Sequence, residues 1–136
     1  MAAPAKSQTV TKAFKGAEAK LAHYRALYVL NSGDPKTINS TLRNIKNAME
    51  DPRLKNKLVV ELIVFGDGVD VFKKSEGYEE TLKALLAKGV SLAQCENTIR
   101  ERNIEKNSLF PFISYVPSGN GEIIIRQQQG WAVVHP

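Results

Sequence analysis

The sequence predicts an α/β protein, a three-layer α/β/α sandwich built on a mostly parallel, five-stranded open sheet. Short apolar runs typical of strands alternate along the chain with longer runs in which apolar residues recur every three or four positions, as in helices. The run at 58–65 is apolar except for Glu61, which is typical of a parallel strand covered on both faces. Because alternating strands and helices form parallel sheets with helices on both faces, this order predicts the sandwich.

Five strands are predicted from runs of β-branched and aromatic residues that end at turn-forming residues. They cover residues 24–30, 58–65, 90–94, 113–116 and 131–135. Right-handed crossovers between parallel strands place every strand-to-helix turn on one edge of the sheet. We therefore expect the turns that follow the first four strands to lie close together.

The first helix has clear signals at both ends. Asp34 is a suitable N-cap, and Pro35 fits the first helical position. Asp51 precedes Pro52 and so avoids the helical conformation, which ends the helix near residue 50. Its buried stripe has helical spacing and consists of Ile38, Leu42, Ile45 and Met49.

The remaining helices are shorter. Gly66-Asp67-Gly68 predicts a sharp turn, since it lacks the third glycine of a dinucleotide-binding loop. Gly89 and Gly130 are expected to end the helices before them. The predicted segments are a brief helix at 69–74, a helix at 77–88, a short helix at 97–102, a loop or short helix at 105–110 and a helix at 121–129.

Residues 1–22 differ in composition from the rest of the chain. They are rich in Ala, Lys, Ser and Thr, which predicts a flexible basic arm, or a short amphipathic helix at 10–21, outside a domain at 23–136. Residues 1–20 contain four lysines and one glutamate, a net charge of +3, so only +2 of the total +5 remains for the rest. A basic arm on a nearly balanced domain is weak evidence for nucleic-acid binding, which we do not expect.

The composition is that of a soluble globular protein, with 43% hydrophobic and 24% charged residues. No apolar run approaches the roughly 20 residues of a membrane span, and the N-terminal lysines are not followed by the apolar stretch of a secretory signal. A single cysteine excludes an intrachain disulfide. We therefore expect a cytoplasmic protein.

Cys95 is the strongest candidate for a functional residue. It lies between a predicted strand and a predicted helix, where unpaired backbone N–H groups and the helix dipole favour the thiolate. The neighbouring Glu96 opposes a second negative charge, which Arg100 or Arg102 could offset. The alternative is that Cys95 packs as a small buried hydrophobe with no chemical role.

Five further residues are predicted to bind substrate near Cys95. Asn97 and Thr98 either cap the helix in which they lie or hydrogen-bond an anionic substrate. Arg100 would add a positive charge. Ser118 and Gly119 open the next strand-end turn, and their backbone N–H groups suit a small anion such as thiosulfate.

His23 and His135 lie near opposite ends of the chain. A metal site made of both histidines and Cys95 would require the fold to gather them, and a Cys–His nucleophilic pair would require His135 beside the thiol. Neither is expected, and the chain has no P-loop pattern. We therefore predict no cofactor and no metal.

Two blocks of sequence carry a family resemblance. The first is Cys-Glu-Asn-Thr-Ile at 95–99, and the second joins Val-Pro-Ser-Gly at 116–119, Glu-Ile at 122–123 and Arg-Gln-Gln-Gln-Gly-Trp-Ala at 126–132. Together they resemble the DsrE/DsrF-like family over roughly residues 24–136. The resemblance implies a three-layer α/β/α domain that assembles into homo-oligomers. It also implies a strand-end cysteine, here Cys95, that accepts sulfane sulfur as a persulfide.

The predicted function is that of a sulfur-relay protein, which takes up sulfane sulfur as a persulfide or thiosulfonate on Cys95 and passes it to a partner thiol. The expected partners are further copies of the chain, and a small sulfur-carrier protein or low-molecular-weight thiol as donor or acceptor. The alternative is a non-catalytic oligomeric protein that holds a small anion or nucleotide-like ligand at the strand ends, with Cys95 structural. Neither nucleic acid nor a membrane is an expected partner.

Overall fold

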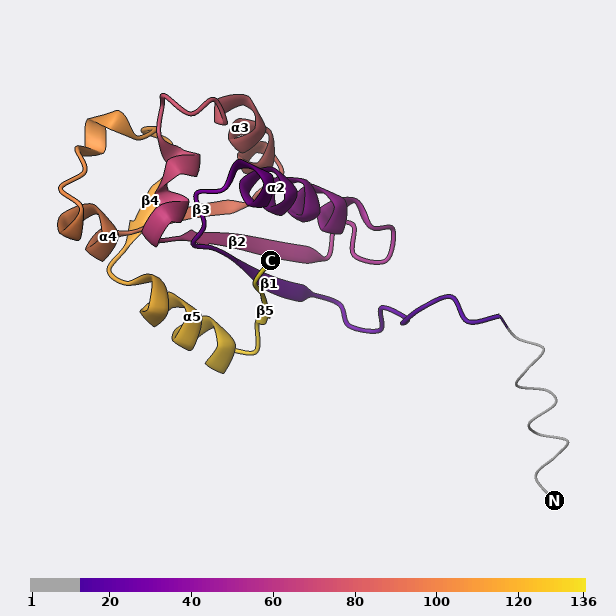
Figure 1. Cartoon of the computed structure of the whole chain (residues 1–136). Coiled ribbons are helices and arrows are strands. Elements are labelled where there is room, and N and C mark those ends of the chain that lie inside the picture. Colours follow the sequence, from indigo (N-terminus) through magenta and orange to yellow (C-terminus); the bar gives the residue numbers. More distant parts are fainter. Residues whose placement is uncertain (1–12) are drawn as a thin grey trace, which may run out of the picture.

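The computed structural model describes residues 13–136 and contains a five-stranded sheet in which every pair of neighbouring strands is parallel. The strand order is β4-β3-β2-β1-β5 (Figure 1). The strands are β1 (Tyr24–Leu30), β2 (Leu58–Val64), β3 (Ser91–Cys95), β4 (Ser114–Val116) and β5 (Ala132–Val134). The predicted α/β class is confirmed, and the sheet is parallel throughout.

Helices fill the connections between the strands. They are α2 (Pro35–Glu50), the 3-10 helix η1 (Gly66–Phe72), α3 (Glu79–Ala87), α4 (Glu96–Glu101), the 3-10 helix η2 (Lys106–Ser108) and α5 (Gly119–Gln128). Most boundaries lie one or two residues from the predicted ones. α5 begins before residue 121 because the Ser118 hydroxyl accepts a hydrogen bond from the Gly121 N–H and caps the helix. Within residues 13–136, no helix is both long enough and apolar enough to cross a membrane.

The described part of the N-terminal arm does not form the predicted amphipathic helix. Residues 13–20 contain neither helix nor strand, and residues 10–12 of that predicted helix lie outside the described residues. Phe14 and Leu21 are exposed, so a helix here would bury no apolar face against the domain. Gly16 has a φ of +90°, which lies outside the helical range. Among residues 13–136, β1 is the first helix or strand.

Apolar side chains cover both faces of the sheet, because alternate residues of a strand point to opposite sides. A larger cluster, which includes Leu62 and Leu92, packs with residues of α2 and α3. A smaller cluster, which includes Leu27, Ile63 and Trp131, covers the other face, and Ile123 of α5 packs against it. Figure 1 shows α2 and α3 on one side of the sheet and α5 on the other. The position of α5 therefore determines how this second face is closed.

A buried charged cluster lies between β2 and α5. Glu61, the polar residue that interrupts the apolar run of β2, is only 3% exposed. Arg126 of α5 donates from Nε to Glu61 Oε1 at 2.8 Å and lies over the Trp131 ring, 4.1 Å from its centroid. The same Nε is 3.4 Å from Glu122 Oε2. Burial and the hydrogen bond with Glu122 raise the pKa of Glu61 to about 7, although Arg126 opposes the rise.

The pH dependence of stability tests this cluster. Folding raises the pKa of Glu61 from its ordinary 4.5 to about 7, so its stabilising contribution is complete below about pH 4.5 and is lost as the pH rises to about 7. The loss is at most about 3 kcal/mol. Glu61→Gln stays neutral, so urea unfolding between about pH 4.5 and pH 8 should show a flatter profile than the wild type.

Glu101→Gln is the control, because this carboxylate lies exposed on α4 and should leave the profile unchanged. A Glu61→Gln profile that falls as steeply with pH as that of the wild type would contradict the raised pKa of Glu61.

Candidate functional site

Cys95 is the last residue of β3 and the N-cap of α4, at the carboxyl edge of the sheet. Its backbone is extended, with φ −68° and ψ 123°, and it lies in register with Val116 of β4. The residue is 5% exposed. Ligands of open parallel sheets bind outside the carboxyl ends of the strands, so this is the edge at which chemistry is expected.

The thiol of Cys95 faces hydrogen-bond donors from two helix starts. Burial raises its pKa, but the backbone N–H and hydroxyl of Thr98 and the backbone N–H groups of Gly119 and Asn97 more than offset burial, so the pKa is below its ordinary value. The thiol makes no capping hydrogen bond to the first turn of α4. The site therefore favours negative charge on this sulfur.

The Thr98 hydroxyl links the thiol to the end of β2. It accepts a hydrogen bond from the Gly66 N–H at 3.0 Å, which leaves its own hydrogen available for the sulfur of Cys95. Gly66 has a φ of +57°, a conformation that favours glycine. Thr98, predicted as a cap or a substrate ligand, therefore orients a donor toward the thiol.

The start of α5 is held against the sheet by a close contact. A Cβ at Gly119 would lie 2.7 Å from Cδ1 of the Phe65 ring, so only glycine fits here without displacing the ring. The hydroxyl of Ser118 is engaged in capping α5. Of the two residues predicted here as anion ligands, Gly119 thus contributes its N–H to the thiol, while the Ser118 side chain fixes the helix that carries it.

The charges around the site differ from the prediction. Glu96, next to Cys95, is paired with Lys106, with Nζ 2.9 Å from Oε1, so its negative charge is balanced. The Lys106 ammonium also lies 4.2 Å from the centroid of the Tyr115 ring. This pairing could not be predicted from sequence, because Lys106 lies ten positions after Glu96, beyond the end of α4.

Arg100 lies exposed in the last turn of α4, five residues after Cys95. It is not among the groups that shift the pKa of Cys95, so its role in stabilising the thiolate stays a prediction. Arg102, four residues after Thr98, points to the end of β2, where it pairs with Asp67 at 2.7 Å. Arg102 and Lys106 are thus two cations that the fold brings to this edge, each paired with a carboxylate.

Gln94 is a buried polar residue that sequence reasoning did not assign. It is fully buried in β3, and its Nε2 donates to the Cys95 carbonyl oxygen at 3.1 Å. Its Oε1 has no hydrogen-bond partner among the described residues. The sequence signal for this residue was a glutamine within an otherwise apolar strand. Its hydrogen bond helps to fix the backbone of Cys95.

The two histidines lie away from the thiol. His135 follows β5 and is 3.0 Å from Asn31 Oδ1 through its Nε2. β2 and β1 separate β5 from β3, a distance of roughly 14 Å at ordinary strand spacing. His23 precedes β1 and so lies at the opposite edge. A Cys–His pair or a metal site from these residues is therefore not formed, and residues 13–136 contain no group of three His, Cys, Asp or Glu suited to a metal.

Comparison with known proteins places the fold among related structures. A family model described as the DsrE/DsrF-like family matches residues 25–136. MTH1491 from Methanobacterium thermoautotrophicum, a protein of unknown function, is 27% identical with a TM-score of 0.77, and the match covers 83% of this chain and 99% of that one. A search of curated proteins gave no match.

Two further solved structures share the fold at lower identity. BT1422 from Bacteroides thetaiotaomicron, a conserved protein of unknown function, is 10% identical with a TM-score of 0.66, covering 89% of this chain and 100% of that one. The ychN protein from E. coli is 14% identical with a TM-score of 0.62, covering 85% and 100%. At these identities the likeness concerns the fold alone.

Replacing Thr98 tests its effect on the thiol. Thr98→Val keeps the side-chain shape but removes the hydroxyl, so the thiol loses a donor and the Gly66 N–H loses its acceptor. We expect a higher pKa for Cys95 and alkylation by iodoacetamide at about pH 7 that is slower by about three- to tenfold. Thr98→Ser keeps the hydroxyl and should react like the wild type. Equal rates in the two variants would show that the hydroxyl has no influence.

Replacing Gly119 tests the contribution of α5. Gly119→Ala forces the Phe65 ring or the start of α5 to move, which takes the Gly119 N–H away from the sulfur and should raise the pKa of Cys95. Gly121→Ala is the matched control, because a Cβ there meets only Ser118, at 3.4 Å. Ultraviolet titration of the thiolate measures the pKa of Cys95 in both variants. If Gly119→Ala titrates like Gly121→Ala, α5 does not set the state of the thiol.

Proposed function

This chain belongs to the DsrE/DsrF-like family, whose members are generally associated with sulfur relay, and we propose that it carries sulfane sulfur on Cys95. In this proposal Cys95 takes up the sulfur as a persulfide or thiosulfonate and passes it to the thiol of a partner. The observation that carries the proposal is the convergence on one sulfur atom of donors from the starts of α4 and α5.

These donors suit both the resting thiolate and the loaded form. A thiolate is the nucleophile of sulfur chemistry, and donors that lower the pKa of Cys95 increase its thiolate fraction near neutral pH. The same N–H groups can solvate a persulfide or thiosulfonate, since each places negative charge beyond the cysteine sulfur. A lowered pKa also makes Cys95 a better leaving group when the sulfur is handed on.

The uptake step needs no redox partner. With thiosulfate, the Cys95 thiolate attacks the outer sulfur, the S–S bond of thiosulfate breaks, and sulfite leaves with the bonding electron pair. The products are the Cys95 persulfide anion and sulfite, so charge and atoms balance. With tetrathionate, the same attack leaves a thiosulfonate on Cys95 and releases thiosulfate.

The release step requires a second molecule. A partner thiolate attacks the terminal sulfur of the persulfide, the S–S bond to Cys95 breaks, and the Cys95 thiolate is regenerated. The chain has no second cysteine, so the acceptor is a small sulfur-carrier protein or a low-molecular-weight thiol. A reducing cytoplasm keeps such thiols available. Because Cys95 is 5% exposed, a slender donor or acceptor fits best.

The low exposure of Cys95 also supports a second candidate function. In that case the chain binds a small anion at the strand ends without chemistry, and the thiol only packs. Thiol titration separates the two functions. A packing cysteine should titrate at or above about 8.5 and react slowly, whereas a carrier should titrate lower and react below neutral pH.

Intact-mass measurement tests the carrier function directly. After incubation with thiosulfate or tetrathionate, the wild type should gain the mass of one sulfur atom or of a thiosulfonate group, and a low-molecular-weight thiol should remove it. Cys95→Ser should gain neither. The proposal fails if the folded wild type gains no adduct under conditions in which the urea-unfolded chain does, or if Cys95→Ser carries the same adduct.

A further inference from the structure

The described part of the N-terminal arm leaves the domain as an extended segment. Residues 13–22 form no helix or strand, and Figure 1 shows them running away from the start of β1. Phe14 is 92% exposed and Leu21 is 61% exposed. Within residues 13–136, the arm thus presents apolar groups that the domain leaves uncovered.

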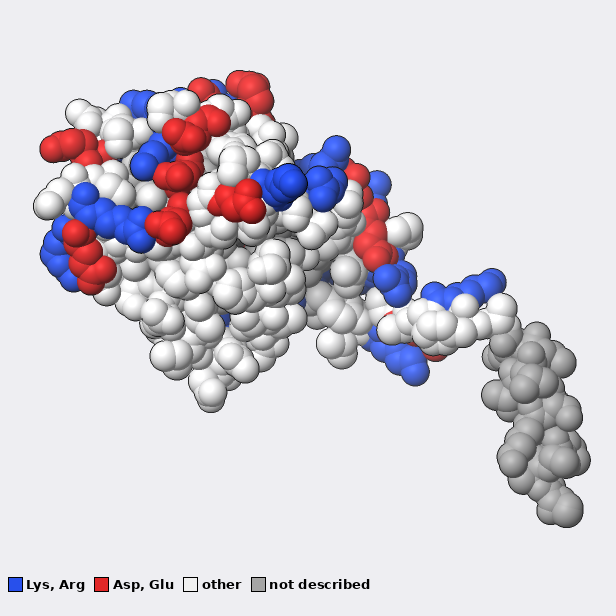
Figure 2. Space-filling view, viewed as in Figure 1, with Lys and Arg blue, Asp and Glu red and all other residues white. Residues whose placement is uncertain are grey.

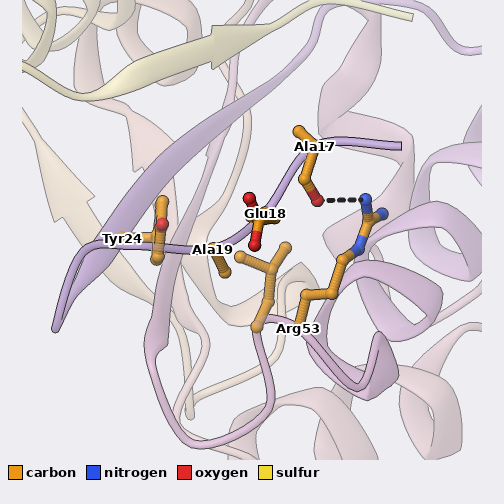
Figure 3. Close-up of a pocket in the computed structure, with 6 residues that line it drawn as sticks. Ala17, Glu18, Ala19, Tyr24 and Arg53 are labelled. Carbon is orange, nitrogen blue, oxygen red and sulfur yellow. Dashed lines mark hydrogen bonds between the residues drawn. The ribbon is translucent and has the colours of Figure 1, made fainter. Parts of the chain in front are cut away.

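One contact joins the arm to the connection from α2 to β2, and a second joins it to the first residue of β1. Arg53 Nη1 donates to the Ala17 carbonyl oxygen at 3.2 Å, and the Tyr24 hydroxyl accepts from the Leu21 N–H at 2.9 Å. Arg53 is itself fixed by Asp51, whose carboxylate accepts from Nε and Nη2 at 3.0 and 2.7 Å. Figure 3 shows Arg53 reaching the Ala17 carbonyl beside a cavity of about 210 Å³. The arm therefore departs on the β2 side of β1.

The other side of β1 is occupied by β5, which forms an edge of the sheet. Within the described chain β5 pairs only with β1, so the outward backbone groups of Ala132–Val134 have no strand partner. The strand is exposed and contains neither the charge nor the proline that usually protects an edge. Val133 is in register with Leu27, on the side where α5 exposes Ile124 and Ile125. In Figure 2 the surface over α5 is largely free of charged side chains.

We propose that the arm of one copy adds to the open edge of β5 in a second copy, with Phe14 packed near Val133. An extended segment and an apolar strand edge are the two components of β-strand addition, and this chain carries both. The arm of a chain cannot pair with β5 of the same chain. Its contacts with Arg53 and Tyr24 hold it on the β2 side of β1, whereas β5 lies on the other side. The partner is therefore another copy.

The lengths are compatible with this pairing. Residues 13–16, which lie beyond the contact of Arg53 with Ala17, span roughly 13 Å when extended, and the three residues of β5 span roughly 10 Å. The family match begins at residue 25, so the arm is an addition to the matched domain. Because the arm of one copy pairs with β5 of another, two copies can exchange arms in a dimer, or each copy can bind the next one in a closed ring.

Sedimentation of full-length variants tests both sides of the contact. Phe14→Asp on the arm and Val134→Lys on the edge should each weaken self-association by at least about tenfold. Ala13→Asp and Leu86→Lys are matched controls that add the same charges beside Phe14 and on α3, and each should change it by less than about threefold. A wild type that stays monomeric, or variants that associate like their controls, would overturn the proposal.

Disulfide trapping then identifies the contacting residues. In a Cys95→Ser background, a Phe14→Cys chain is mixed with chains carrying cysteine at one of the three β5 positions, and mild oxidation should join the two different chains for at least one position. Leu86→Cys is the control position. If no β5 position exceeds the control, the arm does not dock on this edge. Because Cys95 is absent throughout, this outcome is independent of sulfur transfer.

Discussion

The docking of α5 against the end of β2 is the contact on which the environment of the thiol depends. The ring of Phe65 lies so close to Gly119 that no side chain fits there, and the Ser118 cap starts the helix at this point. Further along, Arg126 fastens the helix to the buried Glu61. These contacts deliver the Gly119 N–H to a sulfur that sits on another strand. A shift of α5 would therefore change the pKa of Cys95, although α5 contains no residue of β3.

Two buried polar residues, Glu61 and Gln94, help to position α5 and the backbone of Cys95. Glu61 keeps its proton to about neutral pH, because burial and Glu122 outweigh the attraction of Arg126. The packing of α5 against β2 therefore depends on pH. Gln94 holds the carbonyl of Cys95 from within the core. Such groups are costly to bury unless they are paired.

The sulfur-carrier proposal and the arm proposal concern opposite parts of the molecule. The thiol lies at the carboxyl edge of the sheet, whereas the arm leaves from the amino-terminal end of β1. Assembly through the arm would therefore bring copies together without requiring the thiols to meet. A chain with one cysteine must in any case exchange sulfur with another molecule, so a carboxyl edge left free for donors and acceptors suits that role.

The order of elements and the position of Cys95 could be predicted from the sequence, because both depend on local signals such as apolar periodicity, the Asp34-Pro35 start and the glycine stops. The sequence also indicated Thr98 and Gly119, since strand ends in a parallel sheet converge. Which charges lie near the thiol depends on the three-dimensional packing: Lys106 pairs with Glu96, Arg102 pairs with Asp67, and two strands separate β3 from the strand that precedes His135. Those outcomes depend on side-chain directions and strand order, which are set by packing between distant segments and leave no local signal.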